Sequence, residues 1–219
     1  QNLLKNPYTN LPSKNFWKPS IGDLNQFDIT DIWKSKFKLT KKTKFTTYGS
    51  CFAQNFSNAL KSNDLNWVES EVPPTSKISK SLLKKYNYSI YSSRTQNIYT
   101  PSMLNQLLLL ATTKKIFNEY WKTKNRFYDP LRPTVEPNGF NSKSEMLCSR
   151  NVMLKSLIKS IEDCDVFVFT LGLTERWVNK KNGYEYAVCP GIVGGEFNEK
   201  LHAFSNLNNS DLYKELKSA

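Results

Sequence analysis

The stretch KFTTYGSCFAQNF, from Lys44 to Phe56, decides how this chain folds. Its first five residues are rich in β-branched and aromatic side chains, and Gly49 interrupts them. The apolar residues that follow recur at helical spacing: Phe52, Phe56, Ala59 and Leu60. This pattern predicts a strand, a tight turn and a helix.

Ser50 comes directly after the predicted turn. A turn of this kind places a serine at the C-terminal edge of a sheet, where open α/β folds bind ligands. It also places the serine at a helix N-terminus, where free N–H groups favour negative charge. We hypothesise that Ser50 is a nucleophile, with the backbone N–H groups of Ser50 and Cys51 as oxyanion donors. The alternative is an ordinary N-cap serine in a turn, which the local sequence by itself favours.

Composition indicates a folded domain and does not favour nucleic-acid binding. The 219 residues include 13 Phe, 11 Tyr and 5 Trp, enough for one α/β domain with a substantial core. The net charge of +12 comes mainly from scattered lysines, without an arginine-rich cluster. We therefore do not expect nucleic acid as a partner, and weak binding to an anionic polymer is the alternative.

Cysteine and histidine usage excludes several kinds of site. The four cysteines are widely spaced with no C-x-x-C pair, which argues against a zinc ribbon and against a disulfide framework. A single histidine excludes a multi-histidine metal site, and no metal or cofactor is expected. No apolar run is long enough to cross a membrane, so we expect a soluble, cytoplasmic protein without a membrane partner. The oligomeric state is not predicted.

The order of elements predicts a single domain over residues 1–219. Residues 1–43 form an irregular, aromatic-rich lead-in that we expect to pack over the core. Residues 113–143 form an insertion rich in proline and aromatics, packed over the scaffold. Further elements are expected as strands at 44–48, 65–69 and 165–171, and helices at about 51–62, 77–86, 100–111 and 144–162.

The last third of the chain combines a buried strand with turn motifs. The continuous apolar run at 165–171 predicts a strand buried on both faces, as in a parallel sheet. Asn182-Gly183 predicts a hairpin, and a glycine-rich loop and a helix from about Ser210 follow. Since three parallel strands can be counted and the final helix would ordinarily lead into a fourth, we expect the C-terminal part of the domain to be absent.

Further candidate site residues lie on either side of that strand. The segment from Gly172 to Glu175 would lie at the same sheet edge as Ser50. There the Thr174 hydroxyl is a candidate oxyanion donor and Glu175 a candidate orienting carboxylate. The alternative is that this segment is only a turn that ends the strand. His202, the only imidazole, lies in an expected polar loop and is a weak candidate base. Arg94 and Arg132 are candidates to bind an anionic substrate, or else they anchor loops.

Together these motifs, in this order, resemble the GSCFA family over nearly the whole chain. Gly49 to Ala53 spells the family's name. The other matching segments are Asn6 to Tyr8, Arg94 with Asn97 to Thr100, Tyr128 to Phe140, Val168 to Trp177 and Val188 to Gly191.

The resemblance implies a branch of the SGNH/GDSL hydrolases, with a three-layer α/β/α fold and a flavodoxin-like parallel sheet whose C-terminal strand or strands are missing here. It implies an esterase or acyltransferase that acts on a small-molecule or glycan ester through an acyl-Ser50. Thr174 stands where those enzymes carry an oxyanion asparagine, and the region from Arg94 to Asn97 would hold the second donor. Their Asp-x-x-His block has no match in this chain. A non-catalytic binding module is the alternative.

Overall fold

The computed structural model describes residues 6–30, 32–113 and 115–219. Contacts divide the chain into two units, one up to Thr40 and one from Lys41 to Ala219. The first unit holds a 3-10 turn, η1 (Ser13–Asn15), and a π-helical turn, η2 (Lys18–Gly22). None of its described side chains is buried. That residues 1–43 pack over the core stays a prediction.

The second unit is built on a small parallel sheet. Its strands are β1 (Lys44–Gly49), β2 (Asn66–Trp67) and β5 (Val166–Thr170), in the order β2-β1-β5. Both pairings with β1 are parallel, and Gly49 lies opposite Thr170. The prediction of three parallel strands is therefore confirmed.

Five α-helices accompany the strands in the described residues. They begin where the sequence supplies a capping side chain: Ser50, Thr100 and Ser142 each accept a hydrogen bond from a backbone N–H of the first turn. The helices are α1 (Cys51–Ser62), α2 (Lys80–Lys85), α3 (Pro101–Thr112), α4 (Lys143–Glu162) and α5 (Asn209–Ser218).

The strand β5 differs from its prediction. It pairs only with β1 in the described residues and so lies at the edge of the sheet. Phe167 is 37% exposed. The expectation that this strand is buried on both faces was wrong, because an apolar run reports the chemistry of the strand and not the number of its neighbours.

The described residues of this unit also form two antiparallel sheets. One is the hairpin β3 (Trp121–Thr123) and β4 (Arg126–Tyr128), inside the proline-rich insertion. The other has the order β7-β6-β8, with β6 (Glu175–Asn179), β7 (Glu185–Tyr186) and β8 (His202–Asn206). The predicted turn at Gly183 joins β6 and β7, whereas β8 replaces the polar loop that we expected around His202.

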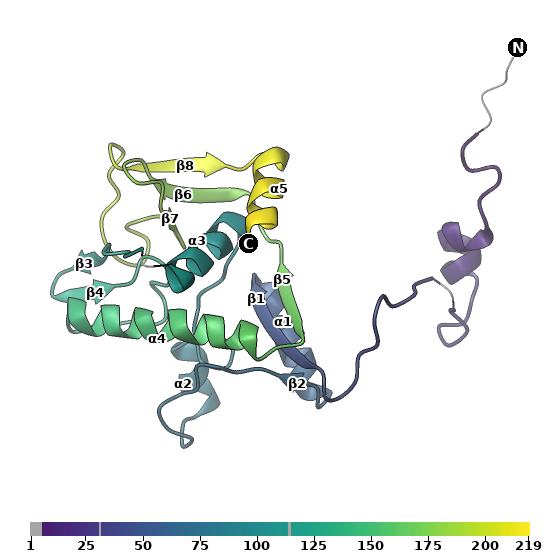
Figure 1. The fold of residues 1–219 in the computed structure, drawn as a ribbon, viewed down its shortest axis with the longest axis horizontal. Helices are drawn as coiled ribbons and strands as arrows, with labels where there is room; N and C mark the ends of the chain where they lie inside the picture. Colours follow the sequence, from purple (N-terminus) through teal and green to yellow (C-terminus); the bar gives the residue numbers. More distant parts are fainter. Residues whose placement is uncertain (1–5, 31, 114) are drawn as a thin grey trace, which may run out of the picture. The chain divides into compact units, whose positions relative to one another are not determined.

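Helix α3 holds the core together. It lies between α4 and the sheet formed by β6, β7 and β8 (Figure 1). Its apolar side chains join Tyr48 of β1, Leu157 of α4 and Tyr186 of β7 in one buried cluster. The observed class is a mixed α/β fold with a small parallel sheet flanked by helices. No helix among the described residues has the length and apolar character needed to cross a membrane.

Candidate active site

The turn at Gly49 brings the ends of β1 and β5 into close contact. Gly49 has a φ of +133°, and a Cβ at this position would lie 2.2 Å from Thr170 Oγ1 and 2.7 Å from the Thr170 carbonyl oxygen. Only glycine fits such a conformation and such an approach. The strand, turn and helix predicted from the sequence are therefore confirmed.

Ser50 caps helix α1 and is hydrogen-bonded to β5. Its Oγ accepts from the Phe52 N–H at 3.4 Å and lies 3.3 Å from Thr170 Oγ1, while its own N–H donates to Thr170 Oγ1 at 3.0 Å. The residue is 8% exposed. The backbone N–H of Ser50, which we expected to serve as an oxyanion donor, is thus already occupied, whereas the Cys51 N–H shows no partner among the described residues.

Thr170 is the site residue that the sequence did not reveal. Its hydroxyl contacts both the N–H and the Oγ of Ser50. The only signal was its place in the register, since the last residue of one parallel strand lies beside the last residue of the next. Inside an apolar run, a threonine gives no other indication of a role.

Gly172 lies beside Ser50, as the shared sheet edge required. A Cβ on Gly172 would lie 3.3 Å from Ser50 Cβ and 3.2 Å from the ring of Tyr99. The Gly172 N–H donates to the Tyr99 carbonyl oxygen at 3.2 Å. The absence of a side chain at Gly172 therefore leaves space next to the serine.

Asn97 belongs to a hydrogen-bond network behind Ser50. Its Oδ1 accepts from Gln54 Nε2 at 2.8 Å and from the Tyr91 hydroxyl, and its Nδ2 donates to the Tyr99 hydroxyl at 2.6 Å. The Tyr91 hydroxyl also lies 3.3 Å from the Ser50 carbonyl oxygen, and burial raises the pKa of Tyr91. The network fixes the segment that carries Asn97 against the turn.

Thr174 and Glu175 continue away from the serine. The Thr174 carbonyl oxygen accepts from the Leu207 N–H at 2.9 Å, and Glu175 begins β6 opposite Asn206. Neither side chain is hydrogen-bonded to Ser50 within the described part of the chain. Their expected roles as donor and orienting carboxylate therefore find no contact in this structure.

Arg94 and Arg132 anchor loops. Arg94 is 5% exposed and donates to the Tyr86 and Val135 carbonyl oxygens and to Glu136, each at 2.6 Å. Arg132 is fully buried and donates to the Arg94 carbonyl oxygen at 2.7 Å. Neither guanidinium faces solvent, so the expectation that they bind substrate gives way to the anchoring alternative.

Buried carboxylates complete this cluster. Asp129 accepts from Arg132 Nε at 3.3 Å and from Arg150 Nη2 at 2.7 Å, and Glu71 lies 3.6 Å from Arg132 Nη1. The Glu71 carboxylate also accepts from the Arg94 N–H at 2.8 Å. Burial lowers the pKa of Arg132, and the neighbouring carboxylates oppose that shift.

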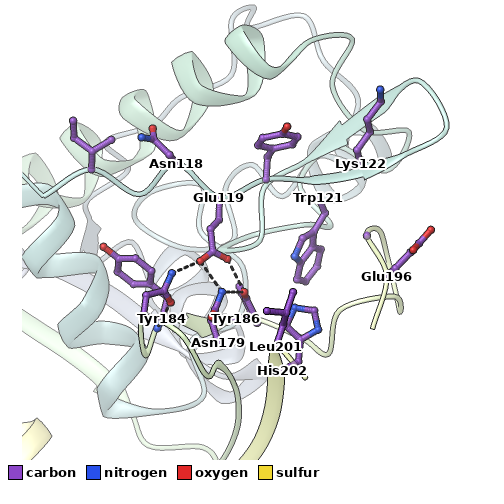
Figure 2. Close-up of a pocket in the computed structure, with 14 residues that line it drawn as sticks. Asn118, Glu119, Trp121, Lys122, Asn179, Tyr184, Tyr186, Glu196, Leu201 and His202 are labelled. Carbon is purple, nitrogen blue, oxygen red and sulfur yellow. Dashed lines mark hydrogen bonds between the residues drawn. The ribbon is translucent and has the colours of Figure 1, made fainter. Parts of the chain in front are cut away.

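His202 lines a pocket that does not include Ser50. It pairs with Asn179 at the end of β6, four residues beyond Glu175, which amounts to about 13 Å along a strand. Its ring packs against the rings of Tyr186 and Phe197, and Figure 2 shows it in the lining of a pocket that also contains Trp121 and Glu119. Its Nδ1 accepts from the Asn198 N–H at 3.0 Å. No contact joins it to Ser50 among the residues that the structure describes.

The fold and the turn define an α/β domain with a serine at the C-terminal edge of its parallel sheet. The chain belongs to the GSCFA family, whose model matches residues 44–219. No curated protein and no solved structure matches the chain. Residues 1–43 lie outside the matched region.

Proposed function

We propose that this domain is an SGNH-type serine esterase or acyltransferase that uses Ser50 on an ester of a sugar or another polar molecule. The observation that carries the proposal is the position of Ser50 in the sheet. The first parallel strand, β1, lies between the second, β2, and the third, β5. Flavodoxin-like sheets begin with this order and bind ligands where it reverses, at the carboxyl end of the first strand. Ser50 follows β1 at this point, which supports a three-layer, flavodoxin-like arrangement.

The proposed reaction has two steps at Ser50. The Oγ forms a bond to the ester carbonyl carbon and gives its proton to a general base, and the alcohol leaves with a proton. Water, or the hydroxyl of an acceptor, then breaks the acyl–Oγ bond and restores the serine. We assign the Cys51 N–H, at the N-terminus of α1, as a donor to the developing oxyanion, because helix N-termini favour negative charge.

The base is supplied by an imidazole or carboxylate that does not contact Ser50 in this structure. Ser50 Oγ has only Thr170 Oγ1 and the Phe52 N–H as hydrogen-bond partners among the described residues. A threonine hydroxyl is too weak a base to take the proton at neutral pH. This observation also favours the second candidate function, a binding module that retains the cleft without the chemistry.

A fluorophosphonate probe distinguishes the two functions. The probe forms a phosphorus–Oγ bond with loss of fluoride only at an activated serine. We expect labelling that disappears in Ser50→Ala and persists in Ser142→Ala, a matched variant because Ser142 is also an N-cap serine. Hydrolysis of an acyl-ester panel should follow the same pattern. Turnover that survives Ser50→Ala would refute the proposal, and a complete lack of labelling and turnover would favour the binding module.

A further inference from the structure

A second site lies over the antiparallel sheet, in the pocket of Figure 2. The pocket has a volume of about 820 Å³ and is formed by the segment before β3, the β6–β7 hairpin and the loop that leads into β8. None of the residues that line it belongs to the Ser50 network. The glycine-rich loop and His202, which the proposed reaction does not use, both line this pocket.

Glu119 is a fixed hydrogen-bond acceptor in the pocket. Its Oε1 accepts from Asn179 Nδ2 at 3.0 Å and from Asn182 Nδ2 at 2.6 Å, and its Oε2 accepts from the Tyr186 hydroxyl at 2.5 Å. An ionised carboxylate accepts about four hydrogen bonds, so one position stays open. Figure 2 shows the three internal bonds holding the group at the centre of the pocket.

His202 supplies the complementary donor. Because its Nδ1 accepts from the Asn198 backbone N–H, the neutral ring must carry its proton on Nε2. Burial lowers the pKa of His202, with the charge of Glu119 opposing the shift, and this favours the neutral ring. Nε2 has no hydrogen-bond partner among the described residues. The pocket therefore offers an N–H donor and a carboxylate acceptor, both positioned by the protein.

The floor of the pocket is built on buried aromatic rings, since Trp121 is 6% exposed and Tyr186 4%. The rings of Trp121 and Tyr186 lie 5.5 Å apart, and Tyr186 packs edge-on against His202 at 5.6 Å. Gly195 allows the loop to pass over this floor, because a Cβ there would lie 2.7 Å from Trp121 Cγ. Its φ of +72° also requires glycine. The exposed side chain of Leu201 extends the apolar surface at the rim.

The charges around the pocket disfavour an anionic ligand. Among the described residues, the lining carries two carboxylates, Glu119 and Glu196, and one lysine, Lys122. The chain as a whole carries a net charge of +12, so the local balance is the opposite of the global one. An aromatic floor with a few placed polar groups is the usual design of a small-ligand site.

We propose that this pocket binds a neutral, polyhydroxylated ligand, such as a saccharide unit. One ligand hydroxyl donates to Glu119, and a second accepts from His202 Nε2. Asn118 and Tyr184 at the rim have side chains without internal hydrogen bonds in the described residues and add further donors and acceptors. The site goes beyond the proposed esterase function and does not depend on it.

Saturation-transfer NMR with the whole chain tests this proposal. The probes are a panel of neutral mono- and disaccharides, with glucuronate as the anionic arm and tetramethylammonium as the cationic arm. We expect signals from at least one neutral saccharide, and a dissociation constant that rises about fivefold in His202→Gln and in Glu119→Gln, the loss of one hydrogen bond each. Ser50→Ala should bind as well as the unmodified protein.

A second pair of variants leaves the internal hydrogen bonds of the pocket intact, so that a loss of binding cannot be attributed to misfolding. Asn118→Ala and Tyr184→Phe remove rim groups only, and their matched controls are Asn58→Ala on α1 and Tyr213→Phe on α5, both exposed. The rim variants should weaken saccharide binding about threefold, with no change in the controls. Binding of tetramethylammonium but of no saccharide would overturn the proposal in favour of an aromatic cation site. No binding of any saccharide, or equal binding by all variants, would overturn it outright.

Discussion

Because Gly49 lies so close to Thr170, we predict that even the methyl group of an alanine at this position strongly lowers the free energy of unfolding. In Gly49→Ala the residue would keep a φ of +133°, a region that costs a non-glycine residue about 1 to 3 kcal/mol. The added methyl would also lie 2.2 Å from Thr170 Oγ1 and 2.7 Å from the Thr170 carbonyl oxygen. Relieving this overlap requires β1 and β5 to separate, which costs about 1 to 3 kcal/mol more.

Loss of chain entropy in the unfolded state returns about 0.4 to 1 kcal/mol. The net expectation is that Gly49→Ala lowers the free energy of unfolding by about 2 to 5 kcal/mol. Gly183→Ala is the matched control, because Gly183 also has a positive φ, +75°, but no atom within 4 Å of its Cβ position. There we expect a loss of about 1 kcal/mol, from backbone strain alone.

Urea denaturation followed by tryptophan fluorescence measures both values, provided that the slope of the transition is unchanged. Equal losses in the two variants would show that the contact with Thr170 contributes nothing and would refute the reasoning. A Gly49→Ala protein that keeps its stability would also show that the turn can relax without separating the strands. Ser50 would then not be held where the proposed function needs it.

Three further predictions follow from other contacts. Asp129→Asn should lower the free energy of unfolding by about 3 to 5 kcal/mol, because it leaves two buried arginines without their shared carboxylate; Asp163→Asn, in an exposed ion pair, should leave the urea midpoint unchanged. Burial raises the pKa of the Glu185 carboxyl group above 4.5, because the folded state favours its protonated form. The stability that Glu185 contributes is therefore greatest below pH 4.5 and is lost as the pH rises through the pKa of the folded state. Glu185→Gln should therefore gain stability relative to the unmodified protein as the pH rises, and a difference that is independent of pH would contradict this. Thr170→Val should cost about 1 to 3 kcal/mol and reduce fluorophosphonate labelling, because it leaves the Ser50 N–H without a partner; unchanged labelling would mean that Thr170 does not position the serine.

Local signals made much of the fold predictable. The helices that begin at Cys51, Pro101 and Lys143 each follow a capping side chain, and apolar periodicity gave their lengths. The hairpin β3–β4 was missed because its strands have three residues each and its turn uses Lys124 at a φ of +54° without a glycine. The strand β8 was missed because its pairing with β6 is a tertiary contact that no short window of sequence reveals.

The candidate site was predictable only in part. Ser50 and Gly172 lie together because each follows a strand of the parallel sheet, and both strands end at the same edge. The sequence predicted these two strands, and so it also predicted that the two residues would be neighbours. The contact of Thr170 with Ser50 depends on the exact pairing register of β1 and β5, which the sequence does not specify. The sequence left both roles of Arg94 and Arg132 open, because an isolated sequence does not show whether a guanidinium finds carboxylates in the interior or an anion in solution.

The buried ionic cluster has a consequence for how the domain opens. Asp129 and Arg132 come from the proline-rich insertion, whereas Arg94, Glu71 and Arg150 come from three other segments. Moving the insertion away would strip charges of their partners in a poorly hydrated interior, which costs several kcal/mol. The part of the insertion around Asp129 and Arg132 is therefore fixed in the interior and is not a lid. The amide hydrogens of this buried part should exchange with solvent only in the same cooperative event that unfolds β1 and α4.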